Sequence, residues 1–104
     1  MPAPAQVFEA IADPTRRALL DLLAQREHSV NDLVACFHVT QPAVSHHLAI
    51  LRKAGLVRNR RAGRQRLYRL HGRPLREVYE WVALYERFWT DKLAALGEHL
   101  RSNP

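Results

Sequence analysis

The chain has 104 residues, of which 47% are hydrophobic and 25% are charged, and its formal net charge is +6 at pH 7. This composition excludes a disordered chain and predicts a single globular domain over residues 1–104. The positive charge favours a polyanionic partner, either nucleic acid or an anionic membrane surface. No apolar run is long enough to span a membrane, and residues 1–5 lack the basic start and apolar core of a signal peptide.

Two helices are predicted in the first quarter of the chain. Residues 6–12 carry apolar side chains at helical spacing, which predicts a short first helix. Asp13-Pro14 then supplies an N-cap and a first-turn proline, so a second helix is expected from there to about Gln25.

A third and a fourth helix follow, separated by about two residues. Ser29 is suited to cap the third helix, and Asp32 can complete a capping box with it. The fourth helix covers residues 40–55. Two short helices joined by a tight turn, the second with a polar outward side, indicate a helix-turn-helix over residues 29–55. The turn lacks the glycine that is usual there, so the spacing supports this prediction.

The fourth helix has two unlike sides. Val44, Leu48 and Leu51 line one side at helical spacing. The other side has hydrogen-bonding groups and cations but no carboxylate. It includes Ser45, His46 and Lys53, with Gln41 and Arg52 at its border and Thr40 at the N-cap. Glutamine, serine and histidine can bond base edges or phosphates, which favours a DNA-reading helix. The alternative is an ordinary amphipathic surface helix.

Residues 56–71 predict a β-hairpin, because apolar and basic residues roughly alternate on either side of a turn that contains glycine. Beside a helix-turn-helix such a hairpin is a wing, whose arginines reach the DNA backbone or the minor groove. These arginines are Arg60, Arg61 and Arg66, with Arg64 at the tip. The alternative is a basic hairpin that is merely solvated.

Charge is distributed unevenly along the chain. Between Leu33 and Arg76 there is no aspartate or glutamate, although this stretch holds ten of the sixteen lysines and arginines. A solvated surface normally mixes charges of both signs. The stretch therefore predicts a surface that is free of anions, so that phosphates can approach it.

A long last helix is predicted over about residues 75–100, within a dimerisation segment at 74–101. Apolar residues recur in it at steps of three and four, and a helix of about 26 residues would be about 39 Å long. Such a stripe is long for a domain this small, which favours a homodimer seam with the first helix packed beside it. The residues expected there are Val7, Phe8, Trp81, Tyr85, Phe88, Trp89, Leu93 and Leu96.

Three stretches resemble the ArsR family of bacterial winged-helix repressors, and the resemblance covers nearly the whole chain. Residues 10–20 are similar to that family's "ALADPTRRRIL" start, and residues 40–51 to its "S-Q-P-A-V-S-x-H-L-x-x-L" helix. Residues 54–57, followed by Gly63, Arg64 and Tyr68, resemble its "AGLV…R…GR…Y" wing. The resemblance implies a mostly α-helical winged helix-turn-helix fold with about five helices, which dimerises through its terminal helices and represses transcription from a palindromic operator.

The resemblance also implies roles for single residues. Gln41, Ser45 and His46 match positions that face the major groove in the family, and Arg64 matches the wing-tip arginine. His47 matches a near-invariant histidine that contacts phosphate or only packs.

The metal-sensing positions of the family are not reproduced. Residues 32–37 hold one cysteine instead of a Cys-x-Cys, and the last helix lacks paired zinc ligands. Residues 79–93 resemble instead the metal-independent, autorepressor-like branch. We expect no metal site and no cofactor, while a repressor that responds to a metal or a small molecule remains an alternative.

Other chemistry receives little support. The single cysteine, Cys36, excludes an internal disulfide, suits a protein of the reducing cytoplasm and is expected to be a buried structural residue. No catalytic arrangement or glycine-rich phosphate loop is present, so we expect no enzyme. The chain is thus predicted to be a cytoplasmic, homodimeric repressor that binds double-stranded DNA. A winged-helix protein-interaction module without a DNA role is the alternative from another class.

Overall fold

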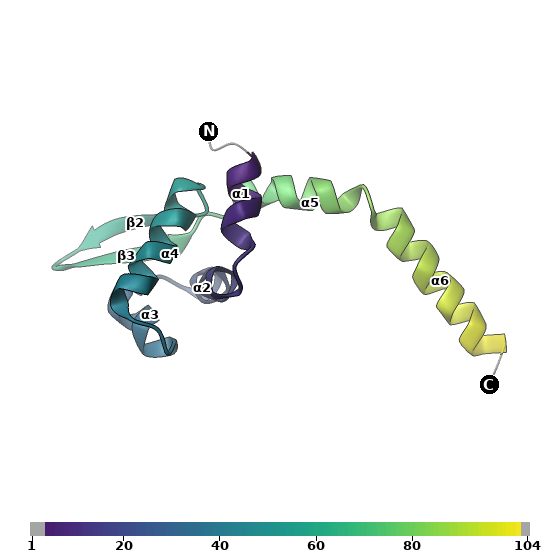
Figure 1. Cartoon of the computed structure of the whole chain (residues 1–104), viewed down its shortest axis with the longest axis horizontal. Helices are drawn as coiled ribbons and strands as arrows, with labels where there is room; N and C mark the ends of the chain where they lie inside the picture. Colours follow the sequence, from purple (N-terminus) through teal and green to yellow (C-terminus); the bar gives the residue numbers. More distant parts are fainter. Residues whose placement is uncertain (1–3, 103–104) are drawn as a thin grey trace.

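The computed structural model describes residues 4–102, which form six α-helices, a 3-10 helix and a three-stranded antiparallel sheet (Figure 1). Four helices and the sheet make up a body, and the last two helices extend away from it. In chain order the elements are α1 (Pro4–Ile11), α2 (Pro14–Gln25), β1 (His28–Ser29), α3 (Val30–Cys36), α4 (Gln41–Lys53), β2 (Val57–Ala62), β3 (Gln65–Leu70), η1 (Arg73–Leu75), α5 (Arg76–Ala83) and α6 (Glu86–Ser102). The mostly helical fold with a β-hairpin wing is confirmed.

Helices α2, α3 and α4 each begin at the capping residue that the sequence predicts. The Asp13 carboxylate accepts a backbone N–H bond from the first turn of α2 at 3.0 Å. Ser29 and Asp32 form a complete capping box, with bonds of 3.1 and 3.2 Å in the two directions. The Thr40 hydroxyl accepts an N–H bond from the first turn of α4 at 3.3 Å. These bonds satisfy backbone donors that a helix leaves unpaired, so local sequence determines where each helix begins.

The sheet has the order β1-β3-β2, with both neighbouring pairs antiparallel. Strands β2 and β3 are the predicted hairpin, and Gly63 in its turn has a φ of 64°, which favours glycine. Strand β1 is not predicted from the sequence. It has two residues, and it pairs His28 with Tyr68 and Ser29 with Leu67. A strand this short has no readable alternation, and its partner is far away in the chain.

The core lies where α1 to α4 meet the base of the wing. Its buried apolar residues are Val7, Ala10, Leu19, Leu20, Leu23, Leu33, Val44, Leu48, Leu51, Ala54, Leu56 and Val57. The position of Val7 corrects the sequence-based expectation of a dimer seam. Its side chain is 1% exposed within the single chain, because this side of α1 packs against α2 and α4. It is therefore not available to a second copy.

The single helix predicted over residues 75–100 is divided into α5 and α6. At the break the N–H of Leu84 donates to the Trp81 carbonyl at 3.2 Å, and that of Tyr85 to the Val82 carbonyl at 2.9 Å. These i to i+3 bonds tighten the last turn of α5 and change the direction of the chain. The sequence at the break contains no proline or glycine, the residues that usually mark a break in a helix.

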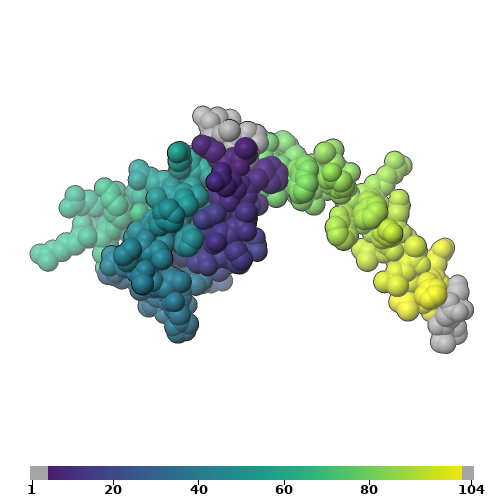
Figure 2. Space-filling view, in the orientation of Figure 1, coloured from purple at the N-terminus to yellow at the C-terminus, as the bar shows by residue number. Residues whose placement is uncertain are grey.

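Helix α6 stands clear of the body, and the described chain measures 63 × 32 × 20 Å along its principal axes (Figure 2). The exposed large apolar side chains among the described residues all lie between residues 79 and 100, on α5, α6 and the link between them. No described helix combines the length and the apolar character that crossing a membrane requires.

Candidate nucleic-acid interface

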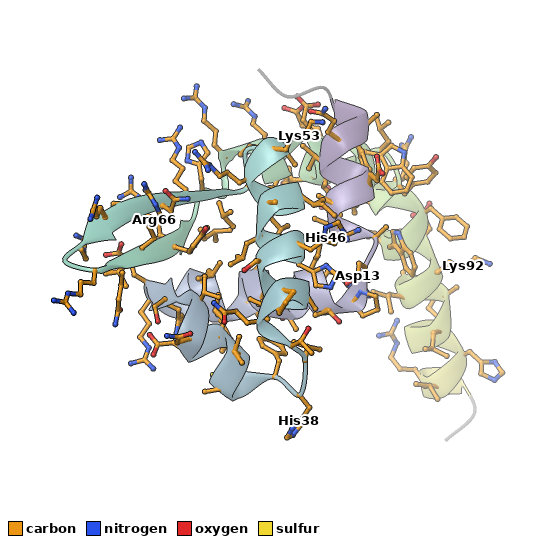
Figure 3. The ribbon with its side chains drawn as sticks, turned by 60° about the vertical axis from the view of Figure 1, so that its left-hand side comes forward. Asp13, His38, His46, Lys53, Arg66 and Lys92 are labelled. Carbon is orange, nitrogen blue, oxygen red and sulfur yellow. The ribbon has the colours of Figure 1, made fainter. Side chains whose placement is uncertain are left out.

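Helix α4 buries one side and presents the other to solvent. Val44, Leu48 and Leu51 are at most 1% exposed, because α1, α2, α3 and β2 all contact this helix. The opposite side exposes the residues that the sequence predicts to meet DNA, namely Thr40, Gln41, Ser45, His46, Arg52 and Lys53. Figure 3 shows His46 and Lys53 along α4, and Arg66 on the wing beside it. The body thus holds α4 with its polar side accessible along its whole length.

His47 lies at the border of this surface, where it contacts Arg16 at the start of α2. The Nη1 atom of Arg16 is 3.4 Å from the Nδ1 atom of His47. A guanidinium only donates hydrogen bonds, so Nδ1 is the acceptor in this contact. Arg16 also donates to the Ala10 carbonyl at 2.6 Å and the Glu9 carbonyl at 3.1 Å. His47 therefore joins α4 to the corner between α1 and α2, a packing contact on the half-buried flank of the helix.

The carboxylate of Asp13 lies at the same corner. Its pKa is lowered, first by the backbone N–H of Arg16 that it accepts, while partial burial opposes this effect. The nearby charge of Arg16 lowers the pKa further. The capping carboxylate thus stays ionised near the corner where Arg16 contacts α4.

Three arginines of the wing differ in how they are held. Arg66 donates from Nη1 to the Asn59 side-chain oxygen at 3.2 Å, and Arg61 donates from Nε to the Gly63 carbonyl at 3.2 Å. Arg64 is exposed in the turn. None of these three side chains forms an ion pair within the part of the chain that the structure describes. Their charges are therefore available to phosphates.

Arg60 differs from its neighbours, because it binds a carboxylate that lies before the acid-free stretch. Its Nε and Nη2 atoms donate to the two carboxylate oxygens of Glu27 at 2.9 and 3.1 Å. The hydrogen bonds from Arg60 lower the pKa of Glu27 and raise that of the guanidinium. The sequence gives no signal for this pair, since Glu27 adjoins the two-residue strand β1 that places it there.

Cys36 is exposed at the end of α3, which corrects the expectation that it is a buried structural residue. Helix α3 ends there, and its last turn turns Leu33 rather than Cys36 toward the core. Within residues 4–102 there is no group of three or more histidine, cysteine, aspartate or glutamate side chains that would hold a metal ion.

The residues expected at a dimer seam, apart from Val7, form a surface on α1, α5 and α6. Phe8 packs edge-on against Trp81 with ring centroids 5.6 Å apart, and Trp81 does the same with Tyr85 at 5.6 Å. Along α5 and α6 the side chains remain between 49% and 67% exposed, at Trp81, Tyr85, Phe88, Trp89, Leu93 and Leu96. Phe8 thus connects this aromatic surface to the body.

The sequence is similar to known regulatory proteins. The family model described as "Bacterial regulatory protein, arsR family" matches residues 13–59. The transcriptional repressor SdpR of Bacillus subtilis is 38% identical over 76 residues, which are 73% of this chain and 84% of that protein. The HTH-type transcriptional regulator Rv2034 of Mycobacterium tuberculosis is 36% identical over 100 residues, which are 96% of this chain and 91% of that protein.

Solved structures show the same likeness. An ArsR-like transcriptional regulator from Rhodococcus sp. RHA1 superimposes with a TM-score of 0.74 at 30% identity, and the match covers 96% of this chain and 92% of that one. A crystal structure of another ArsR family transcriptional regulator gives a TM-score of 0.72 at 32% identity, covering 86% of this chain and 97% of that one. The likeness thus extends over both the wing and most of the C-terminal helices.

Proposed function

The chain belongs to the arsR family of bacterial regulatory proteins, and from this premise we propose that it is a homodimeric repressor that binds a palindromic operator. Members of this family are DNA-binding transcriptional regulators and not enzymes. The observation that carries the proposal is the exposed polar side of α4, which lies beside a wing rich in arginine. A repressor of bacterial genes acts on the chromosome, so we propose a cytoplasmic location.

In this proposal α4 enters the major groove once per subunit. Gln41, Ser45 and His46 read base edges, since all three are exposed on the N-terminal half of the helix. The phosphate backbone and the minor groove are met by cations, namely Arg52, Lys53, Arg61, Arg64 and Arg66, and by Arg60 once it is released from Glu27. Thr40 and His47 keep the helix in position through the cap and the Arg16 contact.

We propose a second copy of the chain as the partner of the exposed surface on α5 and α6. A contiguous apolar surface of this kind marks an interaction site in a soluble protein. The helix pair makes few contacts with its own body, so its apolar stripe has no cover within one chain. Two copies related by a two-fold axis would cover each other's stripe and place two copies of α4 about one or two DNA turns apart.

We further propose that this repressor belongs to the branch of the family that senses no metal. The support is the sequence of residues 79–93, together with a lone exposed thiol at Cys36 in place of a cysteine pair. Metal analysis of the purified protein, and operator binding with and without added zinc, would test this point.

Fluorescence anisotropy with DNA from directly upstream of the coding region tests the main proposal. We expect affinity to fall steeply with salt, and the double variant Ser45→Ala/His46→Ala to lose about tenfold in affinity for this DNA but little for unrelated DNA. The control Gln25→Ala removes an exposed amide at the end of α2 and should bind as the parent protein does. Equal affinity of the double variant and the parent, or no dependence on salt, would overturn the proposal.

A further inference from the structure

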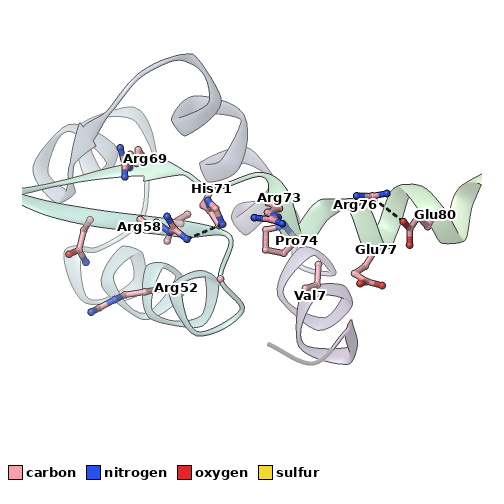
Figure 4. Close-up of a pocket in the computed structure, with 13 residues that line it drawn as sticks. Val7, Arg52, Arg58, Arg69, His71, Arg73, Pro74, Arg76, Glu77 and Glu80 are labelled. Carbon is pink, nitrogen blue, oxygen red and sulfur yellow. Dashed lines mark hydrogen bonds and ion pairs between the residues drawn. The ribbon is translucent and has the colours of Figure 1, made fainter. Parts of the chain in front are cut away.

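A groove of about 880 Å³ runs along the base of the wing, between the end of α4, the start of β2 and the η1–α5 segment (Figure 4). We call it the wing-base groove. Five arginines and a histidine line it, namely Arg52, Arg58, Arg69, Arg73, Arg76 and His71. Its two acids, Glu77 and Glu80, are at the α5 end, and Glu80 is bound by Arg76 at 2.9 Å. The end formed by the hairpin therefore carries only positive charge.

Two of these cations face each other in the sheet. Arg58 on β2 and Arg69 on β3 are paired in register, so their side chains leave the same face of the hairpin. Like charges directly opposite each other destabilise a sheet. Neither side chain forms an ion pair within residues 4–102, and the nearby Glu27 is bound by Arg60. An anion between the two guanidiniums would remove this repulsion.

His71 lies among the arginines of the groove. The Nη2 atom of Arg58 is 3.2 Å from Nε2 of His71, and Nε2 must be the acceptor because a guanidinium only donates. Burial lowers the pKa of His71 first, and the charges of Arg58, Arg73 and Arg69 lower it further. The imidazole is therefore neutral, and the three guanidiniums whose charges act on it give this end of the groove a positive potential that attracts anions.

The shape of the wing-base groove fits a short ligand better than a DNA strand. The residues proposed to read bases begin at Gln41, about 21 Å along the axis of α4 from Gly55, which lines the groove. The wing tip at Arg64 is at the far end of the hairpin. At the α5 end Arg76 is bound to Glu80 and the carboxylate of Glu77 is added, so this end offers less positive charge to a continuing phosphate backbone than the hairpin end does. The volume is in the range of pockets for small molecules.

We propose that the wing-base groove binds a small multivalent oxyanion, either an organic phosphate or a polycarboxylate, between Arg58, Arg69 and Arg73. The bound anion lowers the affinity for DNA, because it neutralises cations that lie beside α4 and the wing. This regulatory effect rests on the proposed repressor function, whereas the binding of the anion does not.

Titration calorimetry without DNA tests the site, with inorganic pyrophosphate and citrate as probes and chloride salts holding ionic strength constant. The parent protein should bind at least one probe saturably, and Arg58→Gln/Arg73→Gln should bind it at least tenfold more weakly. Arg87→Gln/Arg101→Gln removes the same charge from α6, away from the groove, and should bind as the parent does. Equal weakening in both double variants, or heat that never saturates, would show general charge attraction and overturn the proposal.

A second measurement covers the case in which the double variant does not fold. The ring signals of His71 in the NMR spectrum of the parent protein should shift with the same saturation curve as the heat, and unmoved signals would overturn the site. In the DNA assay, a saturating probe should lower affinity by about fivefold or more. If neither probe binds and the double variant binds DNA more weakly, the groove contacts the phosphate backbone of DNA, and the anion site is overturned. If a probe binds saturably but the protein binds no operator DNA, the repressor function is overturned and the anion site is supported.

Discussion

Arg60 and Glu27 form a two-bond ion pair across the outer face of the sheet, with distances of 2.9 and 3.1 Å. Leu67 on β3 lies between β2, which carries Arg60, and β1, which follows Glu27, since it pairs with Arg60 on one side and with Ser29 on the other. The wing residues include no aspartate or glutamate, but folding places the carboxylate of Glu27 beside the wing. This carboxylate competes with phosphates for one of the wing arginines.

We predict that Glu27→Gln increases the affinity for DNA and steepens its salt dependence. The change frees Arg60 for one more phosphate, which corresponds to a slope of log affinity against log salt that is steeper by about 0.9. Anisotropy titrations over a series of salt concentrations measure this slope.

Two variants serve as controls. Arg60→Gln should make the salt dependence no steeper than that of the parent protein, and Glu86→Gln on α6 controls for the loss of a negative charge elsewhere. Weaker binding by Glu27→Gln would mean that the pair positions Arg60 rather than competing for it. Thermal stability should change little, because the pair is exposed to solvent.

We predict that Leu93→Glu converts the protein from a dimer to a monomer. Leu93 is 67% exposed within one chain and lies in the apolar stripe of α6, so a glutamate there would be buried without a partner at a dimer seam. Ala94→Glu adds the same charge to an exposed position one residue on, which faces about 100° away, and should leave the dimer intact. Light scattering coupled to gel filtration distinguishes the two. A parent protein that is already a monomer would contradict the seam and favour an interaction module that binds a different protein.

We predict that Thr40→Ala lowers the free energy of unfolding by about 1 kcal/mol, because the first turn of α4 loses its side-chain acceptor. Thr40→Ser keeps a hydroxyl at the N-cap and should retain most of the stability. Urea denaturation followed by circular dichroism measures both variants. Similar stability of Thr40→Ala and the parent would show that the 3.3 Å bond does not stabilise the start of the helix.

We predict that stability falls as the pH decreases below 6.5 and that His71 contributes to this fall. The pKa of His71 in the folded protein is lowered from 6.5, so the unfolded chain takes up this proton first. The contribution is therefore complete above pH 6.5 and decreases as the pH falls toward the lower folded value. His71→Gln cannot titrate, and urea denaturation should show a smaller decrease for it over this range. An equal decrease in both proteins would contradict the assignment.

The carboxylates Asp13, Glu27 and Asp32 act in a separate pH range. Their pKa values are lowered in the folded protein from 3.8, 4.5 and 3.8, mainly by hydrogen bonds from Arg16, Arg60 and Ser29. Their contributions are complete above these unfolded values and are lost as the pH falls below them. Measurements above about pH 5 therefore report on His71 without interference from these groups.

The predictions that hold are those whose causes lie within a few residues of each other. The starts of α2, α3 and α4 follow from Asp13, Ser29 and Thr40, because each side chain bonds an amide of its own first turn. The hairpin follows from alternating residues around Gly63, which accepts the positive φ of the turn. The exposed and buried sides of α4 follow from helical periodicity alone.

The features that the sequence does not reveal depend on contacts between distant segments. Val7 belongs to the core because α2 and α4 pack on its side of α1. Helical periodicity shows which residues of α1 share a side, but it does not predict which element will cover that side. The two-residue strand β1 carries Glu27 to the wing and so places a carboxylate beside the acid-free stretch. The break between α5 and α6 is not marked in the sequence, because no proline or glycine lies there.

The sequence by itself therefore determined the helix starts, the wing and the polar side of α4, because hydrogen bonds and side-chain periodicity within one element decide them. Only the tertiary structure decided which wing arginine is neutralised, how the apolar stripe is presented and that Arg58, Arg69 and Arg73 meet His71 in one groove. The physical reason is that charges and surfaces act through space, and sheet order and helix packing bring together residues that the chain keeps far apart.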